Sequence, residues 1–259
     1  MIHLKSEKEI ATMQEGGKKL KRVLTETLIQ VKPGISAAKI DKFADDLIRK
    51  EGGEPSFKRV KGYRWASCIC INDCVVHGIP HKEIILKEDN VVTVDLGMYY
   101  QGFHTDMSWT VRVEDPIRQL ADKDPNDKIN KFLKTGERAL KNGIAQVKLG
   151  NRIGHISQAI QNTIEPEGYG VVEELVGHGV GKKLHEDPEV PGLLMRPLSK
   201  TPELKIGMTL AIEAIYVMGK PDVYIDEADG WTIRTKDGTI ASCFEKTIAL
   251  TRGGLLVLT

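Results

Sequence analysis

The sequence predicts an α+β protein of one domain, residues 1–259, built from two related halves at roughly 1–120 and 121–259. In each half, two segments with helical periodicity precede segments that read as strands. The halves also share a sparse internal repeat, because residues 31–53 and 147–169 carry identical residues at one constant offset. The matching pairs are Val31/Val147, Lys32/Lys148, Gly34/Gly150, Ile40/Ile156, Glu51/Glu167 and Gly52/Gly168. Helices followed by strands in both halves indicate an α+β architecture with pseudo-two-fold symmetry.

The first half begins with two predicted helices. Residues 6–31 show apolar residues at helical spacing, and Ser6 with Glu9 forms a capping box at the start. The sequence KPG at 32–34 ends this helix. Residues 36–50 form the second helix, which has one apolar face and is followed by a glycine pair.

The remaining elements follow in order. Residues 55–75 are predicted to be strands and loops, and residues 90–113 a β-hairpin. A polar, proline-containing link at 114–127 leads to predicted helices at 127–147 and about 152–165. The order of helix, VKxG link and helix repeats that of the first half, which supports the two-half interpretation.

Composition indicates an ordinary globular protein, with 41% hydrophobic and 28% charged residues. The formal net charge of +1 gives no field that would attract DNA or a membrane surface. No apolar run reaches the roughly 18–20 residues that cross a bilayer, and the N-terminal stretch MIHLKSEKEI lacks the apolar core of a secretory signal. We therefore expect a cytoplasmic protein with no DNA or membrane partner. We expect a monomer, because neither an exposed heptad repeat nor a long apolar patch indicates an oligomer.

The cysteines are Cys68, Cys70, Cys74 and Cys243. Strand alternation in CICINDC places Cys68 and Cys70 on one face. A zinc site is one interpretation, although this spacing differs from the usual C-x2-C pattern. Buried, reduced thiols are the preferred interpretation for a cytosolic protein.

The hairpin carries an aspartate on each arm. If its turn centres on Tyr100 and Gln101, then Asp95 and Asp106 face each other across the two strands. Directly opposed residues have Cβ atoms about 4.5–5.5 Å apart, so two like charges there destabilise the pair, and burial increases the cost. A cation between them removes the problem. The alternative is that each aspartate caps a turn or pairs with a lysine or arginine.

Further candidate ligands lie in the second half. Glu213 lies in the apolar run at 208–217, and Glu245 lies in the apolar run at 241–250. His178 lies between two glycines, which allow a ligand or another strand to approach closely. A lone histidine is more often an ordinary core or surface residue, but four unexplained acids favour a ligand here.

These five residues together predict a dinuclear metal site. The four carboxylates are balanced by two divalent cations, with the imidazole as a neutral donor. Mostly oxygen ligands with one nitrogen suit Mn, Fe or Co, and Zn remains a candidate. Paired metals about 3.5–4 Å apart are a known arrangement in aminopeptidases and phosphatases.

Several longer motifs accompany these residues and extend over nearly the whole chain. They are PSFK at 55–58, INDCVVHGIP at 71–80, GHGVGKKLHEDP at 177–188, IEA at 212–214, DGWTIRTKDG at 229–238 and FEKTI at 244–248. With the hairpin acids, they make the chain resemble the type I methionine aminopeptidases of metallopeptidase family M24. That resemblance implies the pita-bread fold, in which two pseudo-symmetric halves form a central antiparallel sheet covered by helices.

The resemblance also implies roles for individual residues. The five metal ligands would be Asp95, Asp106, His178, Glu213 and Glu245, with Asp106 and Glu245 bridging two ions. The implied reaction is removal of the initiator methionine from nascent chains with a small second residue, by a metal-bound hydroxide. Glu213 would handle the proton of the water, and His185 would help to stabilise the oxyanion. His77 would contact the substrate backbone or the leaving group.

A methionine pocket is implied by the same resemblance. Its walls would be Phe57, Tyr63, Cys68, Leu184 and Trp231, and thiol and aromatic groups suit a thioether; the alternative is that these residues are plain core. The sequence departs from the family pattern at Val60, Leu184 and Ala214, which places the shape of the pocket in question but removes no ligand.

Other activities remain open. A prolidase or Xaa-Pro aminopeptidase shares this fold but usually carries an extra N-terminal domain, whereas this chain begins almost at the first catalytic-domain helix. A non-catalytic relative that binds peptide, ribosome or RNA is a different class, and such relatives typically lose metal ligands. The basic stretch GGKKLKR at 16–22 would suit a transient ribosome contact, although a solvated helix face is the preferred interpretation.

Overall fold

The computed structural model describes residues 2–114 and 127–259. Its helices are α1 (Glu7–Leu28), α2 (Ala37–Lys50), α4 (Lys128–Ile144) and α5 (Ile153–Ile164), with short 3₁₀ turns η1 (Phe57–Arg59), η2 (Glu165–Glu167) and η3 (Leu198–Lys200). Its strands are β1 (Glu54–Pro55), β2 (Ser67–Ile71), β3 (Cys74–Val76), β4 (Val91–Tyr100), β5 (Phe103–Arg112), β6 (Gly170–Val171), β7 (Val176–Gly179), β8 (Glu186–Pro191), β9 (Thr209–Val217), β10 (Val223–Ile225), β11 (Ile233–Thr235), β12 (Ala241–Thr251) and β13 (Gly254–Val257).

The four predicted helices are confirmed, with ends that differ by a few residues. The capping box is present at the start of α1, where Ser6 Oγ accepts the Glu9 N–H and Glu9 accepts the Ser6 N–H. Ser36 likewise caps α2 with its side chain. Most of the predicted link at 114–127 lies outside the described residues. No helix of the described chain is long and apolar enough to span a membrane.

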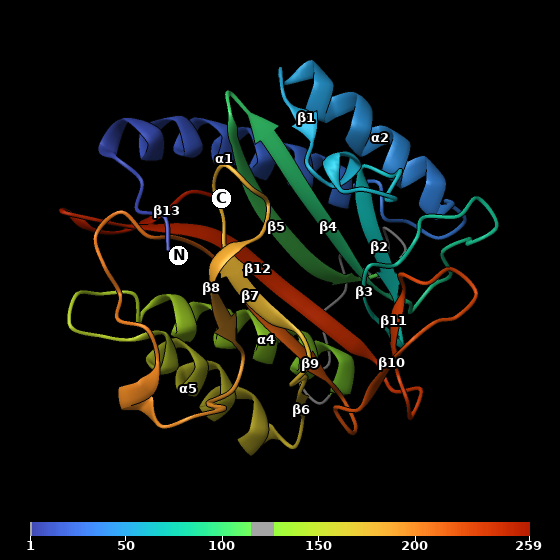
Figure 1. The fold of residues 1–259 in the computed structure, drawn as a ribbon. Coiled ribbons are helices and arrows are strands. Elements are labelled where there is room, and N and C mark those ends of the chain that lie inside the picture. Colours follow the sequence, from blue (N-terminus) through green and yellow to red (C-terminus); the bar gives the residue numbers. More distant parts are fainter. Residues whose placement is uncertain (1, 115–126) are drawn as a thin grey trace.

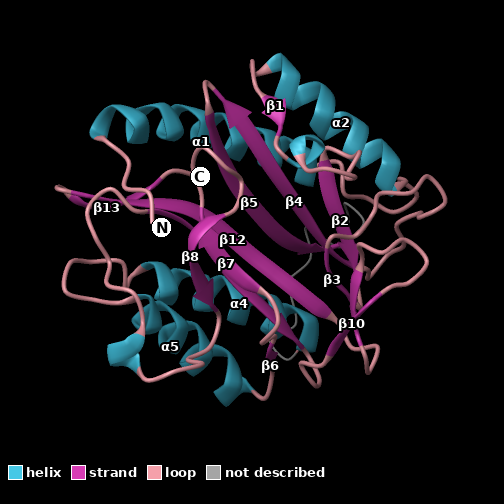
Figure 2. Ribbon diagram, in the orientation of Figure 1, coloured by secondary structure: helices cyan, strands magenta, loops and turns pink. Residues whose placement is uncertain are grey.

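Each half pairs two helices with one antiparallel sheet, as Figures 1 and 2 show. In the first half, β5 pairs with one edge of β4 along its whole length, and β1 and β2 pair with separate parts of the other edge. In the second half, the strand order is β13-β12-β9-β7-β8, with β6 on β9. The helices α1 and α2 cover the first sheet, whereas α4 and α5 cover the second (Figure 1). The predicted two-half α+β architecture is confirmed.

The two sheets meet along β5 and β12. Thr110 Oγ1 donates to the Cys243 carbonyl at 2.8 Å, and the Asp106 N–H donates to Thr247 Oγ1 at 2.9 Å. Because β5 and β12 belong to different sheets, hydrogen bonds of threonine hydroxyls connect the two halves here. A small sheet of β10, β11 and β3 adds a second connection between the halves.

The predicted register of the hairpin is wrong. Asp95 pairs with Ser108, and Asp106 pairs with Gly97, so the two aspartates are diagonal neighbours on one face. The turn lies one residue later than expected, at Gln101 and Gly102, whose φ values are 47° and 92°. Diagonal residues lie about 7–8 Å apart, which weakens the direct repulsion that the sequence predicted.

Candidate metal centre

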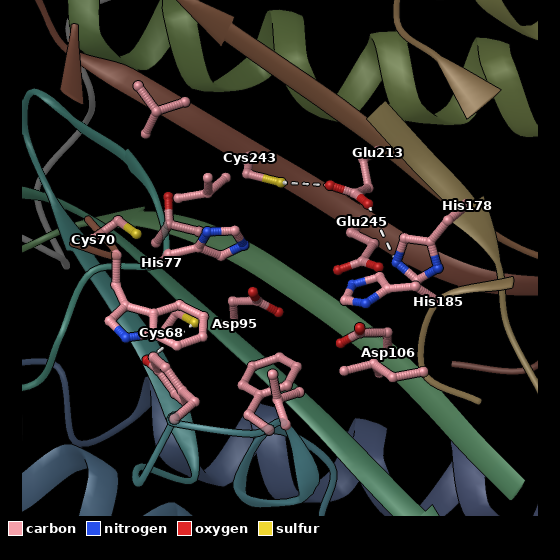
Figure 3. Close-up of a pocket in the computed structure, with 18 residues that line it drawn as sticks. Cys68, Cys70, His77, Asp95, Asp106, His178, His185, Glu213, Cys243 and Glu245 are labelled. Atoms are coloured by element: carbon pink, nitrogen blue, oxygen red, sulfur yellow. Dashed lines mark hydrogen bonds and ion pairs between the residues drawn. The ribbon is translucent and has the colours of Figure 1, made fainter. Parts of the chain in front are cut away.

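All twelve residues predicted to be catalytic, substrate-binding or metal-binding line one cavity of about 150 Å³. Its lining includes Phe57, Tyr63, Cys68, His77, Asp95, Asp106, His178, Leu184, His185, Glu213, Trp231 and Glu245. Figure 3 shows the four acids with His178 and His185 gathered together, and His77 lying apart from them toward Cys68 and Cys70. Most of the other lining residues are aromatic, aliphatic or thiol groups, so the cavity has an acidic floor and an apolar wall.

Four strands supply the four carboxylates. Asp95 comes from β4, Asp106 from β5, Glu213 from β9 and Glu245 from β12. Glu213 and Glu245 are directly paired across β9 and β12, so this pair has the opposed arrangement that the sequence predicted for the aspartates. Because β5 and β12 adjoin, the hairpin acids and the second-half acids point toward the same space (Figure 3).

Ligand-type atoms converge at the centre of this cluster. One oxygen each of Asp106 and Glu245 and one ring nitrogen of His178 lie within 4.8 Å of one another. His178 Nε2 is 3.7 Å from Glu213 Oε1, while its Nδ1 is 2.8 Å from the Gly179 carbonyl. A carbonyl on Nδ1 favours the tautomer that leaves Nε2 free as a donor atom for a metal.

The cluster also contains unpaired buried oxygens. Within the described chain, Asp95 Oδ1 and Glu245 Oε1 have no hydrogen-bond partner. A buried acceptor without a partner is costly, and several carboxylates at one buried point are costlier still. The residues present therefore fit divalent cations, which would supply the missing partners.

Burial and mutual repulsion raise the pKa values of the four acids strongly. Burial raises the pKa of Asp106 to about 7, and burial with the Asp106 charge raises the pKa of Glu213 to about 8. The pKa values of Asp95 and Glu245 rise well above the usual range for the same reasons. Without a cation, the cluster thus favours protonated carboxyls.

Three histidines are held neutral around the acids. Burial, then the nearby His185, lowers the pKa of His178 to about 4. Burial also lowers the pKa values of His77 and His185. The rings of His178 and His185 meet edge to face at 4.4 Å. Neutral imidazoles can donate or accept a hydrogen bond near pH 7.

The apolar wall is built by the segment between β1 and β2 together with Trp231. Tyr63 contacts the rings of Trp231 and Phe57 edge to face, at 5.2 and 6.3 Å. Its hydroxyl lies 3.3 Å from Cys68 Sγ. Gly97 on β4 makes room for this wall, because a Cβ there would lie 2.9 Å from the Phe57 ring.

Several cavity residues escaped the sequence reasoning. Cys243 Sγ lies 3.9 Å from Glu213 Oε2, and Cys70, Val75, Val76 and Thr93 also line the cavity. Strand alternation could have found Cys243, because it precedes Glu245 by two residues on the same strand. Of the departures from the family pattern, Val60 and Leu184 line the cavity, whereas Ala214 is buried elsewhere on β9.

The cysteines are free and buried, which confirms the interpretation as reduced thiols. In the described ranges, the group of side chains with metal-ligand spacing contains no cysteine. The zinc interpretation of CICINDC therefore has no support.

The fold and the acidic cluster together define a metallopeptidase. Residues 11–252 match the model of metallopeptidase family M24, and the chain belongs to that family. It is 39% identical to methionine aminopeptidase 1 of Bacillus subtilis, over all of this chain and 99% of the relative. The crystal structure of methionine aminopeptidase from Thermotoga maritima superimposes with a TM-score of 0.92 at 36% identity, covering 100% of this chain and 99% of the other.

A more distant neighbour shares the fold. The prolidase of Pyrococcus furiosus superimposes with a TM-score of 0.76 at 20% identity. The match covers 99% of this chain but 65% of the prolidase.

Proposed function

We propose that this chain is a methionine aminopeptidase that removes the initiator methionine from nascent chains with a small second residue. The observation that carries this proposal is that the five predicted metal ligands and an apolar wall of aromatic and thiol groups line one cavity. Full-length similarity to methionine aminopeptidases supports it.

The metal requirement follows from the acidic cluster. The residues that would hold two divalent ions are Asp95, Asp106, His178, Glu213 and Glu245. Mn, Fe, Co and Zn are the candidates, in keeping with mainly oxygen donors. Such ions supply Lewis-acid activation of water and stabilise developing negative charge.

The chain's own residues would handle protons and position the peptide. The Glu213 carboxylate lies on the cavity floor, where it can accept the proton of the attacking water. His185 lies beside His178 and can donate an N–H toward the oxyanion of the scissile carbonyl. His77, whose ring centroid lies 6.5 Å from that of Trp231, would contact the substrate backbone or the leaving amine. Both histidines are neutral at pH 7, which leaves each ring one donor and one acceptor.

The methionyl side chain would lie against Phe57, Tyr63, Cys68, Leu184 and Trp231. A cavity of about 150 Å³ is comparable in size to one that holds a single benzene-like group. Because the acids line the same cavity, the space beside the apolar wall suits one side chain of a peptide. Polarizable sulfur makes favourable contacts with aromatic rings, which favours a thioether over a straight alkyl chain of equal length.

The test is hydrolysis of Met-Ala-Ser by the purified protein with and without divalent metal. We expect release of methionine with Mn²⁺ or Co²⁺ and none after treatment with a chelator. If metal-loaded protein left this peptide intact but hydrolysed Ala-Pro, a prolidase activity would replace the proposal. Metal analysis of the same sample measures the stoichiometry, which we expect to be near two.

We also propose a cytoplasmic, monomeric enzyme whose partners are nascent N-termini. The basic stretch at 16–22 lies on α1, where Arg22 and Lys19 contact Glu51 at 2.6 and 3.7 Å. These ion pairs support a solvated helix face over a ribosome-binding patch.

A further inference from the structure

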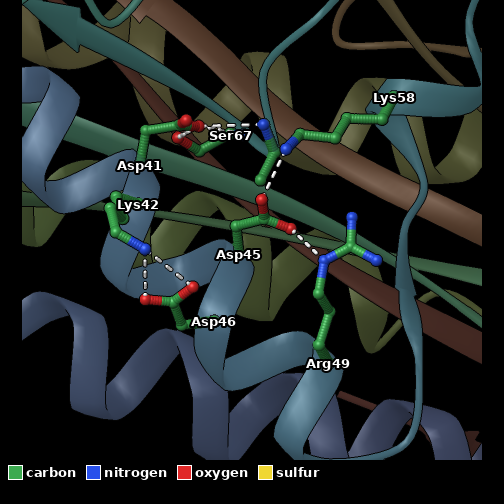
Figure 4. Close-up of polar contacts among 8 residues, drawn as sticks. Asp41, Lys42, Asp45, Asp46, Arg49, Lys58 and Ser67 are labelled. Atoms are coloured by element: carbon green, nitrogen blue, oxygen red, sulfur yellow. Dashed lines mark hydrogen bonds and ion pairs between the residues drawn. The ribbon is translucent and has the colours of Figure 1, made fainter.

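The helix α2 lies against the segment that forms the apolar wall, and it meets this segment through an aspartate. Asp41 Oδ1 accepts three hydrogen bonds, from the Ala66 N–H at 2.9 Å, the Ser67 N–H at 2.9 Å and the Ser67 hydroxyl at 2.8 Å (Figure 4). Ala66 and Ser67 are completely buried. One carboxylate oxygen thus holds the start of β2 in place.

This contact leads directly to the cavity. The Ser67 carbonyl accepts the Tyr63 hydroxyl at 2.8 Å, and Cys68 follows as the next residue of β2. Tyr63 and Cys68 both line the cavity, whereas Asp41 does not. Asp41 therefore reaches two wall residues through Ser67 without any contact of its own with a bound peptide.

A second aspartate holds the other end of the same segment. Asp45, one helical turn beyond Asp41, forms ion pairs with Lys58 at 2.5 Å and with Arg49 at 2.9 Å (Figure 4). Lys58 lies in η1, directly after the cavity residue Phe57. The two aspartates thus fix both ends of residues 57–68, which supply most of the apolar wall.

We propose that Asp41, supported by Asp45, is a positioning residue that sets the width of the cavity and so the selectivity for methionine as the first residue of the substrate. This inference rests on the proposed function. Its physical basis is that loss of the Asp41 carboxylate leaves two buried N–H groups and a hydroxyl without an acceptor. The start of β2 must then shift to find new partners, and Tyr63 and Cys68 shift with it.

The test compares Asp41→Ala with Asp46→Ala, using metal-loaded protein and the peptides Met-Ala-Ser and Leu-Ala-Ser. Asp46 is the matched control, because it lies on the same helix and forms an exposed ion pair with Lys42. A single methylene in an apolar pocket changes selectivity about 10–200-fold. For Asp41→Ala we therefore expect KM for Met-Ala-Ser to rise about tenfold, kcat to change by less than about threefold, and the preference for methionine over leucine to fall about tenfold. For Asp46→Ala we expect all three values to match the wild type.

Asp41→Asn separates positioning from fold stability. Its amide oxygen can still accept the hydrogen bonds, so we expect it to restore most of the selectivity even if its melting temperature stays low. Should Asp41→Ala fail to fold, Ser67→Ala removes only the hydroxyl donor and should shift KM in the same direction by a smaller factor. Metal content must stay at the wild-type value in each variant.

The outcomes that overturn the inference are distinct from failure of the proposed function. Wild-type protein that leaves Met-Ala-Ser intact would reject the proposed function. Active wild type with unchanged KM and selectivity in Asp41→Ala, or in Ser67→Ala if the former does not fold, would reject the positioning role. A fall in metal content would also reject it, because the effect would then pass through the acidic cluster.

Discussion

Removal of the metal should make the stability of this protein depend steeply on pH. The reason is the group of buried carboxyls, whose pKa values rise when no cation is present. Asp106 has a pKa of about 7 in place of its ordinary 3.8, and Glu213 has a pKa of about 8 in place of 4.5. Between the ordinary and the raised value, the folded protein keeps a proton that the unfolded chain has released.

The direction of the effect follows from that difference. The stability contributed by each carboxyl is fully present below about pH 4 and is lost as the pH rises through the raised pKa. The buried histidines, whose pKa values are lowered from 6.5, act in the opposite direction but only below about pH 6.5. The thiols have an ordinary pKa of 9.0, so they contribute little below about pH 8.5. Between about pH 6.5 and about pH 8.5, the change in stability with pH therefore comes mainly from the carboxyls.

Across this window, the folded, metal-free protein holds on average at least one more proton than the unfolded chain. Each retained proton lowers the free energy of unfolding by about 1.4 kcal/mol per pH unit. Metal-free protein should thus lose about 3 kcal/mol between about pH 6.5 and about pH 8.5. Metal-loaded protein should be more stable, by about 2.7 kcal/mol when free metal is 100 times its Kd.

Urea unfolding of chelator-treated protein, followed by tryptophan fluorescence at several pH values, measures this loss. Asp95→Asn removes one proton-binding carboxyl from the same cluster, so the metal-free slope should be shallower than in the wild type while Asp106 and Glu213 still contribute. A metal-free stability that stays constant or rises across the window would refute the reasoning.

Three further predictions follow from single contacts. His178→Ala should abolish turnover and weaken metal uptake, measured by metal analysis; unchanged activity would remove it from the ligand set. His77→Ala should lower kcat by about 10²–10⁴-fold with metal stoichiometry still near two, and loss of metal would contradict its role on the substrate. Gly136→Ala should destabilise the protein by about 1–3 kcal/mol in urea unfolding, because its Cβ would lie 2.5 Å from the Phe244 ring. Gly253→Ala, which meets nothing closer than 3.6 Å, should leave stability near the wild-type value.

Local signals explain which elements could be predicted. The α1 helix begins at the predicted cap because Ser6 and Glu9 satisfy free N–H groups without help from the rest of the fold. The predicted register of the hairpin was wrong because its turn was placed at Tyr100 and Gln101, one residue too early. Gly102, with φ of 92°, is the better second turn residue, since a two-residue hairpin turn of this kind needs positive φ at both positions. The glycine can be read from the sequence. A turn at Gln101 and Gly102 pairs Asp95 with Ser108 and Asp106 with Gly97, so the two aspartates become diagonal neighbours.

The sequence by itself determined the helices and the two-half order, because each depends on spacing between near neighbours in the chain. The four acids and His178 stood out by their apolar or glycine neighbours, whereas His77 and His185 were predicted only from motifs that resemble the family. Tertiary structure alone decided how these side chains meet. Asp106 is joined to Thr247, 141 residues away, through hydrogen bonds of 2.9 and 2.8 Å. Contacts over such separations depend on how the two halves pack, and only that packing brings Asp106 beside Glu245 and His178. Burial at this junction then raises the pKa values of the acids and leaves oxygens without partners, which no local pattern in the chain encodes.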